Sequence, residues 1–342
     1  MANCNKLFLD FNGDLTLTPT KKAKLKKSKG DLRDRIRKHF AEKHSGYVPN
    51  FFIQGSYKLK TTIRTKEDEC DLDDGIYFFR KPDVSGATLQ SWVKDAVTGA
   101  TSTPPEHRKK CIRVIYAGDY HIDLPVYYKL KSTDDTEHPN LAVNNEEFQL
   151  SDPKEFVNWF NDQKDEDGQL IRVVKYLKAL GDHKRNKMPN GLTMSVLAEN
   201  NISYDEREDI ALKDTLVSIK ASINEDEGGT FECIVPTTPN DDLFEEYDAI
   251  RKQNFLNALD SFIEDAKKAI AESNQLRASK LWKKHLGDRF PDGADEDVDS
   301  KQAQLNVLKT AILSGAAKTN STGQIQQGSG VQNLPHRNFG GE

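Results

Sequence analysis

The feature that most constrains this chain is a pair of carboxylates inside a strand-like segment that follows a Gly-Ser dipeptide. Residues 51–79 read FFIQGSYKLKTTIRTKEDECDLDDGIYFF, with Gly55-Ser56 between two apolar segments and Asp71 and Asp73 in the second. Side chains at i and i+2 of a strand point to the same face. Two carboxylates there repel each other unless a cation lies between them, and Mg²⁺ suits such oxygen ligands. Gly55 lets backbone amides approach a phosphate, to which Ser56 can donate.

A third carboxylate lies in residues 120–128, YHIDLPVYY, where Asp123 interrupts an otherwise apolar strand. A charge in a buried strand is costly unless it is paired or bound to a metal. If this strand lies beside the first, three carboxylates converge on one or two metal ions, which supports two-metal phosphoryl or nucleotidyl transfer. Taken alone, DLDDG at 71–75 is more typical of a solvated turn or a calcium-like loop. The ordered set of GS, DxD and a later strand aspartate is more specific.

The pattern along the chain predicts an α+β protein. Segments rich in Val, Ile, Tyr and Phe predict strands in the first half, and apolar residues at helical spacing predict helices in the second. Ser151 or Asp152 can cap the helix at 151–162. The predicted strands are 48–54, 71–79, 111–116 and 120–128, and the predicted helices include 151–162, 168–183, helices within 241–286, and 301–313.

These elements suggest three parts. Residues 1–165 are expected to hold a mixed sheet and an N-terminal helix, and residues 166–314 are expected to be helical. Residues 315–342 are rich in Gly, Ser, Asn and Gln and poor in large apolar residues. Because such a composition does not offset the entropy lost on ordering, the last part is expected to be a flexible tail.

A basic segment precedes the first predicted strand. Residues 21–40 hold ten Lys or Arg and two Asp, a net charge of +8, while Leu32, Ile36 and Phe40 form one stripe of a helix. The base rate for charge runs favours a solvated amphipathic helix. The alternative is that some of these cations line a cleft that holds phosphates.

Composition excludes several classes of protein. The net charge of −5 argues against general nucleic-acid packaging, although a local basic groove remains possible. The four cysteines, Cys4, Cys70, Cys111 and Cys233, form no CxxC pair, which argues against a zinc ribbon or a disulfide framework. No apolar run is long enough to span a membrane, and the first residues lack the apolar core of a signal peptide. A cytoplasmic protein is expected.

At these motifs the chain resembles the nucleotidyltransferase superfamily that includes oligoadenylate synthase and cyclic GMP-AMP synthase. It is most similar to the bacterial cGAS/DncV-like nucleotidyltransferases (CD-NTases) of CBASS anti-phage defence. The similarity lies in QGSYKLKT, CDLDDGIYF and HIDLPVY, in SDPKEFVNWFND, which resembles the segment joining the two lobes, and in LIRVVKYLKAL with MPNGLTMSVLA of the helical lobe. It extends from about residue 30 to about residue 290. It implies a bilobal nucleotidyltransferase fold, with residues 1–165 as the catalytic core and residues 166–314 as the helical C-terminal lobe.

The resemblance implies roles for individual residues. Asp71, Asp73 and Asp123 would be catalytic and would bind two Mg²⁺ ions, with Mn²⁺ a possible substitute, and Asp123 would help prepare the attacking ribose hydroxyl. The nucleotide-binding candidates on the phosphate loop and the helical lobe are Gln54, Gly55, Ser56, either Lys178 or Lys175, and either Thr193 or Ser195.

The resemblance also implies partners. The chain lacks the Cys and His cluster of the DNA-sensing animal enzymes, so zinc-dependent DNA sensing is not expected. The C-terminus, with Gly340, Gly341 and Glu342, suits attachment by an E1/E2-like conjugating partner, although Glu342 departs from a diglycine end and an ordinary disordered terminus is the alternative. A product-activated effector protein is a further implied partner.

The implied reaction is the synthesis of a cyclic di- or trinucleotide second messenger from NTPs, with ATP and/or GTP as substrates and pyrophosphate as the leaving group. Two alternatives remain. A linear, oligoadenylate-type synthase could use the same metal site. A nucleotide-binding or antitoxin-like module with a vestigial site is disfavoured, because all three carboxylates are present.

Overall fold

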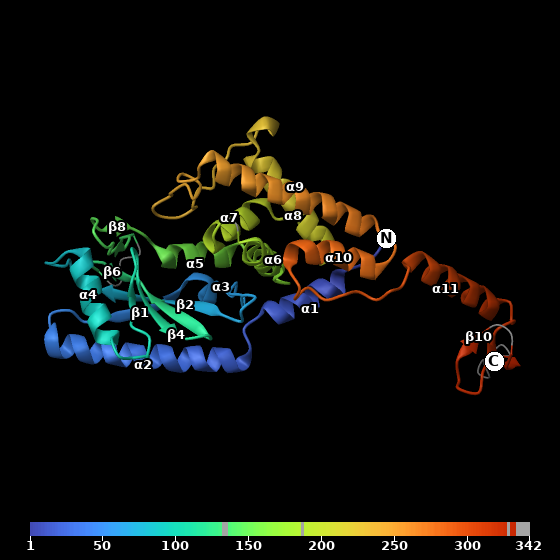
Figure 1. The fold of residues 1–342 in the computed structure, drawn as a ribbon, viewed down its shortest axis with the longest axis horizontal. Helices are drawn as coiled ribbons and strands as arrows, with labels where there is room; N and C mark the ends of the chain where they lie inside the picture. Colours follow the sequence, from blue (N-terminus) through green and yellow to red (C-terminus); the bar gives the residue numbers. More distant parts are fainter. Residues whose placement is uncertain (132–135, 186–187, 327–328, 333–342) are drawn as a thin grey trace, which may run out of the picture.

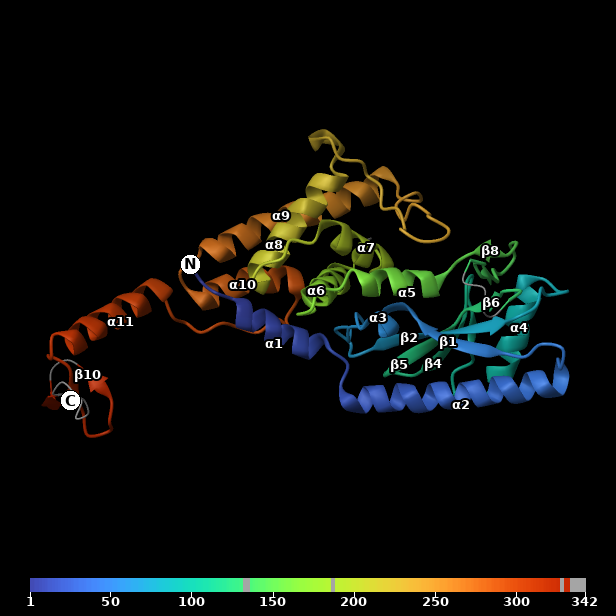
Figure 2. The same cartoon turned by 180° about the vertical axis from the view of Figure 1, so that it is seen from behind.

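The protein has a sheet lobe and a helical lobe, joined side by side (Figures 1 and 2). The computed structural model describes residues 1–131, 136–185, 188–326 and 329–332. The α+β class and the division into a mixed sheet and a helical lobe are confirmed. The boundary between the lobes at 165/166 remains a proposal.

One mixed sheet organises the first lobe. Its path is β3-β4-β5-β2-β6-β7-β8, and β1 pairs with β2 outside this path. The central strand β2 runs parallel to β5 and β6, which are successive parts of one segment, and antiparallel to β1. The strands are β1 (Asn50–Gln54), β2 (Cys70–Phe78), β3 (Glu106–His107), β4 (Ile112–Tyr116), β5 (Tyr120–Leu124), β6 (Val126–Tyr128), β7 (Asn140–Leu141) and β8 (Gln149–Leu150).

The alternation of residues along β2 gives the sheet two different faces. Leu72, Ile76 and Phe78 enter the core that α2 (Pro19–Lys43) and α4 (Gly86–Val97) cover. Asp71 and Asp73, at the intervening positions, point to the other face. Helices of the second lobe lie on the side of the sheet opposite α2 (Figure 1). Asp71 and Asp73 face that lobe, because both act electrostatically on Lys178 of its helix at 169–184.

Helix α2 is an amphipathic helix on the face opposite to Asp71 and Asp73. Thr18 caps it by accepting a hydrogen bond from the Lys21 amide, and Pro19 occupies the first turn. Its predicted apolar stripe is confirmed, because Leu32, Ile36 and Phe40 are buried, together with Leu25. Its position favours the interpretation of the basic segment as a solvated amphipathic helix.

The second lobe is helical and takes its first helix from the N-terminus. Phe8 and Phe11 of α1 pack with Tyr176 and Phe290, so α1 belongs to the core of the helical lobe although it precedes the sheet in sequence. Besides α2 and α4, the α-helices of the chain are α1 (Asn5–Leu15), α3 (Gly55–Leu59), α5 (Pro153–Asp162), α6 (Gln169–Lys184), α7 (Gly191–Asn201), α8 (Glu208–Ile223), α9 (Ala249–Ala271), α10 (Gln275–Leu286) and α11 (Val298–Leu313).

The C-terminal segment extends away from the two lobes (Figures 1 and 2). After α11, the strands β9 (Lys318–Thr319), β10 (Ile325–Gln326) and β11 (Val331–Gln332) form a small antiparallel sheet in the order β10-β9-β11. Composition predicts a flexible tail here, whereas backbone pairing with an Asn320–Gly323 turn gives this segment local structure. Gly340, Gly341 and Glu342 lie outside the described residues.

Within the described residues, every helix is too short or too polar to cross a membrane.

Candidate active site

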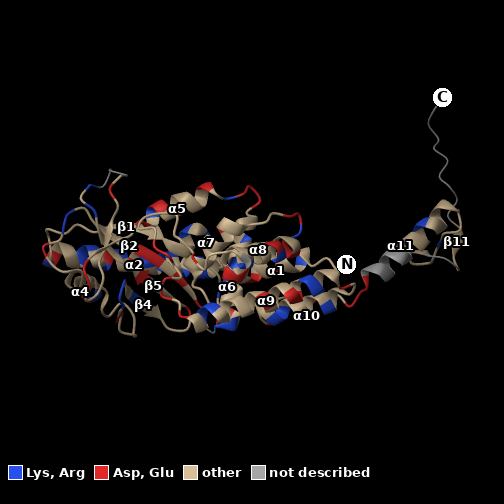
Figure 3. Ribbon diagram, turned by 90° about the horizontal axis from the view of Figure 1, so that it is seen from above, with Lys and Arg blue, Asp and Glu red and all other residues tan. Residues whose placement is uncertain are grey.

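Three neighbouring strands bring the predicted carboxylates together. In the parallel pairing of β2 with β5, Asp73 lies opposite Asp123 and Asp71 lies opposite His121. In the antiparallel pairing of β4 with β5, Arg113 lies opposite Asp123. Residues directly opposite each other share a face, so the two aspartates of β2 and Asp123 form one row on the face toward the helical lobe. Figure 3 shows acidic positions of β2 and β5 side by side.

Gly55 is required where the chain turns from β1 into the short helix α3. Its φ is 61°, in the left-handed region that glycine tolerates. A Cβ atom at this position would overlap the Oδ2 atom of Asp73. The absence of a side chain therefore lets the loop backbone lie directly against the carboxylate of Asp73. The sequence suggests a different reason for glycine here, namely the approach of backbone amides to a phosphate.

Ser56 links this loop to the other carboxylate of β2. Its hydroxyl lies 3.4 Å from Oδ1 of Asp71, to which it can donate, and 2.7 Å from the Thr62 hydroxyl. The Thr61 amide donates to the Ser56 carbonyl at 3.0 Å, which closes the turn after α3. The GS dipeptide is thus held beside both aspartates of the DxD motif.

Asp73 lies at the electrostatic centre of this row. Burial, then the nearby Asp71 and Asp123, raises the pKa of Asp73 well above its ordinary value, against the opposing effect of Lys178 and Arg113. The three neighbouring carboxylates repel one another when they are ionised, and a bound divalent cation would reduce that repulsion. The donor set, three carboxylates on one face, fits a hard cation such as Mg²⁺.

Two residues on this face, Arg113 and His121, were not among the site residues predicted from the sequence. Arg113 donates from Nε to Oδ1 and from a terminal nitrogen to Oδ2 of Asp123, each at 2.7 Å. His121, two residues before Asp123, has its pKa lowered by burial and by Arg113. The period-two pattern of 111–116 already places Arg113 on one face of a strand, but only the register of β4 on β5 shows that it meets Asp123.

The structure separates the two lysines of α6. Lys178 donates to the Thr61 hydroxyl at 3.0 Å and to its carbonyl at 3.2 Å, and it lies close enough to Asp71 and Asp73 to be attracted by both. Desolvation lowers the pKa of Lys178 to about 8 despite that attraction. Lys178 therefore reaches the candidate site.

Lys175 points elsewhere. It donates to Asn12 at 3.2 Å and to the Thr16 hydroxyl at 2.9 Å, where α1 ends. Burial, followed by repulsion from Lys22 and Arg172, lowers its pKa to about 8. Lys175 thus holds α1 against α6 and does not join the carboxylates.

The two hydroxyl candidates of α7 are buried and bonded to their own helix. Ser195 donates to the Gly191 carbonyl at 2.8 Å, and Thr193 donates to the Asn190 side chain at 3.2 Å. Gly191 itself packs against Lys178, where a Cβ atom would lie 3.1 Å from Cε of the lysine. The first turn of α7 therefore borders the site, and the choice between Thr193 and Ser195 remains open.

Gln54 supports the loop from behind. It is buried, its amide donates to the Tyr127 hydroxyl at 2.9 Å, and its carbonyl accepts from Tyr77 at 3.3 Å. These partners occupy its polar atoms, so the structure gives Gln54 a packing role under the GS loop. Its predicted contact with nucleotide remains a prediction.

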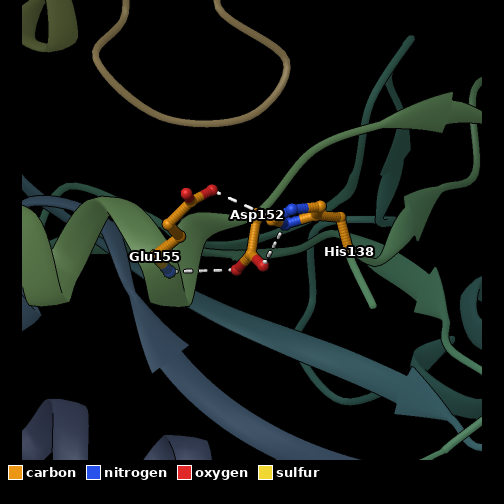
Figure 4. A group of neighbouring side chains, drawn as sticks. All are labelled: His138, Asp152 and Glu155. Carbon is orange, nitrogen blue, oxygen red and sulfur yellow. Dashed lines mark hydrogen bonds and ion pairs between the residues drawn. The ribbon is translucent and has the colours of Figure 1, made fainter. Parts of the chain in front are cut away.

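A second polar cluster closes the junction of the lobes. His138, Asp152 and Glu155 meet at the start of α5 (Figure 4). Among the described residues, they form the group of three possible metal ligands whose ligand atoms all lie within 4.8 Å of one another. The carboxylates of Asp71, Asp73 and Asp123 are not gathered to that extent.

Hydrogen bonds already explain this cluster. Asp152 caps α5 by accepting from the amides of Lys154 and Glu155, as the sequence allowed, and it accepts from Nδ1 of His138 at 3.1 Å. The Thr238 amide donates to Glu155 at 2.9 Å, and its hydroxyl lies 3.3 Å from Nε2 of His138. The cluster therefore fastens the loop around Thr238, from the helical lobe, to the end of the sheet.

Comparisons with known proteins agree with this geometry. Residues 49–127 match the family model "Cyclic GMP-AMP synthase DncV-like, nucleotidyltransferase domain". This range contains the GS loop, the DxD strand, Arg113 and Asp123.

Solved structures of Vibrio cholerae DncV share the fold of both lobes. The crystal structure of this cyclic AMP-GMP synthase, described as a prokaryotic cGAS homolog, is 21% identical, with a TM-score of 0.72 over 85% of this chain and 98% of that chain. Its complex with nonhydrolyzable GTP is 20% identical, with a TM-score of 0.73 over 85% and 97%. Its complex with the linear intermediate 5′ pppA(3′,5′)pG is 19% identical, with a TM-score of 0.72 over 85% and 97%. Residues 49–127 thus match a DncV-like nucleotidyltransferase domain, and the chain has a two-lobed fold like that of the DncV structures.

Proposed function

We propose that this protein is a Mg²⁺-dependent cyclic oligonucleotide synthase that joins NTPs, with ATP and/or GTP as substrates, into a cyclic di- or trinucleotide. The observation that carries the proposal is the row formed by Asp71, Asp73 and Asp123, with Gly55-Ser56 on one side and Lys178 on the other. The DncV structures with GTP and with a linear dinucleotide intermediate support this substrate class.

In the proposed reaction, a ribose hydroxyl of one nucleotide attacks the α-phosphorus of another. A new oxygen–phosphorus bond forms, the bond between the α-phosphorus and the oxygen that bridges it to the β-phosphate breaks, pyrophosphate leaves, and the hydroxyl proton passes to solvent. Asp71, Asp73 and Asp123 would hold the metal, which when bound supplies charge neutralisation and a more acidic hydroxyl. To close a dinucleotide ring, a ribose hydroxyl of the linear product attacks that product's own α-phosphorus, the α–β phosphoanhydride bond breaks and a second pyrophosphate leaves. A trinucleotide needs one further addition before the ring closes.

The protein's own contribution is positioning and charge. The loop at Gly55 lies directly against Asp73, so a phosphate held by this loop is next to the carboxylates. Ser56 can turn its hydroxyl from Asp71 toward a phosphate oxygen, and Lys178, now bonded to Thr61, is the nearby cation for a triphosphate.

The test is a double substitution, Asp71→Asn with Asp73→Asn, assayed by pyrophosphate release and by mass spectrometry of the products. We expect loss of both activities, with a folded protein by circular dichroism. Unchanged NTP consumption would refute the proposal. Phosphatase-resistant products indicate rings, whereas phosphatase-sensitive products indicate the linear synthase. One incubation with all four NTPs, each labelled singly, identifies the bases.

The biological setting is part of the proposal. The protein would act in cytoplasmic anti-phage signalling, and its product would activate an effector protein. The three-part division at 165/166 and 314/315 is proposed as the catalytic core, the helical lobe and the tail, with the correction that α1 and α5 pack in the core of the helical lobe although they precede residue 166. Conjugation of the tail through Gly340, Gly341 and Glu342 would be detected as a covalent adduct when the protein is incubated with an E1/E2-like partner and ATP.

A further inference from the structure

Both carboxylate oxygens of one candidate metal ligand already have a cationic partner. Arg113 binds Oδ1 and Oδ2 of Asp123 through two parallel hydrogen bonds of 2.7 Å. Both side chains are largely buried, with 20% of Arg113 and 12% of Asp123 exposed. Bidentate pairs of this kind are among the stronger and more directional polar contacts in proteins.

The pair forms because the site has more carboxylates than cations. Asp71, Asp73 and Asp123 face Lys178 and Arg113, and Lys178 is committed to Thr61. Arg113 therefore occupies Asp123, and the three carboxylates stay further apart than a closed group of ligands.

We propose that Arg113 acts as a stand-in cation, which keeps Asp123 occupied until nucleotide arrives. The nucleotide-free protein then binds divalent cations weakly, and a cation reaches Asp123 together with the triphosphate. This inference rests on the proposed function and adds an order of binding to it.

Charge explains the coupling. A divalent ion at Asp123 would lie within a few ångströms of the guanidinium, and like charges at that distance repel strongly where little water screens them. A triphosphate reverses the balance, because it brings several negative charges and oxygens that a guanidinium binds as well as it binds a carboxylate. Arg113 is thus a positioning residue that acts through Asp123.

The experiment measures Mn²⁺ binding to nucleotide-free protein, from the electron paramagnetic resonance signal of free Mn²⁺. The wild type should bind weakly, and Arg113→Gln should bind at least about tenfold more tightly, as expected for removal of a positive charge beside the ion. Arg113→Lys, which keeps the charge but loses the fork, should fall between them. Arg108→Gln is the matched control, because Arg108 lies just after β3, is half-exposed and binds Glu106, and it should change Mn²⁺ affinity little.

A second background makes the result specific. In Asp123→Asn protein, Arg113→Gln should tighten Mn²⁺ binding much less than it does when Asp123 is present, because the ligand that Arg113 occupies is gone and only the loss of charge near Asp73 remains. Circular dichroism checks the folding of each variant, and Arg113→Lys serves if Arg113→Gln fails to fold.

The inference is wrong if Arg113→Gln binds Mn²⁺ no more tightly than the wild type, or if the nucleotide-free wild type already binds two ions tightly. Neither result depends on turnover, so both are distinct from failure of the proposed function, which unchanged NTP consumption in the Asp71/Asp73 variant would show.

Discussion

The two faces of the central sheet carry the same ion pair in opposite circumstances. Toward α2, Arg33 binds both oxygens of Asp74, whose side chain is 1% exposed, and Lys29 of α2 is a second cation attracted by the same carboxylate. Toward the helical lobe, Arg113 binds Asp123 in the same fork, but two further carboxylates surround the pair. The face toward α2 is electrostatically complete and stabilises the fold. The other face has carboxylates in excess, which is suited to binding a cation.

The largest expected effect tests the complete face. Arg33→Ala leaves Asp74 buried without its partner, which should lower the free energy of unfolding by about 3–5 kcal/mol. Urea unfolding followed by circular dichroism measures the change. Arg37→Ala, on the exposed side of the same helix with its partner Asp34, should cost less than about 1 kcal/mol. Similar losses in the two variants would contradict the comparison.

The next effect tests the incomplete face. Lys178→Met should leave stability nearly unchanged or raised, because it removes a desolvated ammonium, but it should lower kcat/KM for pyrophosphate release by about 100-fold through loss of a cation beside the triphosphate. Lys175→Met is the matched control on the same helix. If the two variants lose activity equally, the assignment of Lys178 to the site is wrong.

A smaller effect tests the contact between the loop and Asp73. Gly55→Ala places a methyl group where Oδ2 of Asp73 lies and strains a backbone with positive φ. We expect a loss of about 1–2 kcal/mol in stability, typical of such strain, and at least about tenfold in activity from displacement of the carboxylate. Gly118→Ala also has positive φ but meets no neighbouring atom, so it should show the strain cost alone.

The smallest effect is a pH dependence of stability. Burial lowers the pKa of Lys175 to about 8 in the folded protein, below its ordinary 10.5. Below pH 8 both states hold the proton and the folded state bears the cost of the buried charge. Between pH 8 and 10.5 the unfolded state binds more protons, so stability rises with pH through this window.

The measurement compares the wild type with Lys175→Met by urea unfolding at pH 8.0 and 9.5. The stability advantage of Lys175→Met should shrink by about 1 kcal/mol per pH unit. Lys6→Met, at an exposed position of α1, should run parallel to the wild type. Parallel curves for Lys175→Met would contradict the burial of its ammonium.

Local pattern was sufficient for the strands β1, β2, β4 and β5–β6 and for the carboxylates they carry, but it missed the two-residue strands β3, β7 and β8. The spacing of Asp71 and Asp73 fixes their common face, and the isolated charge in 120–128 marks Asp123, because these signals depend only on the two-residue period of a strand. The capped start of α5 at Asp152 was equally local.

Tertiary pairing was required for the rest. Lys175 and Lys178 are three positions apart, so their side chains point about 60° apart around the helix. They have different partners only because α1 docks on one side of α6 and the turn after α3 docks on the other. The contact of Arg113 with Asp123 depends on strand register. The placement of α1 in the helical lobe depends on packing between segments far apart in the chain.

That placement of α1 has a mechanical consequence. The chain crosses between the lobes once between α1 and α2 and again between β8 and α5. Near the first crossing, Arg289 of the helical lobe donates to Asp14 at 2.6 Å and to the carbonyls of Arg64 and Thr65. Two bodies joined at two separate points keep one easy rotation, about the line through those points. The opening and closing of the lobes that exchanges nucleotide and product is therefore expected to be a hinge rotation about a single axis.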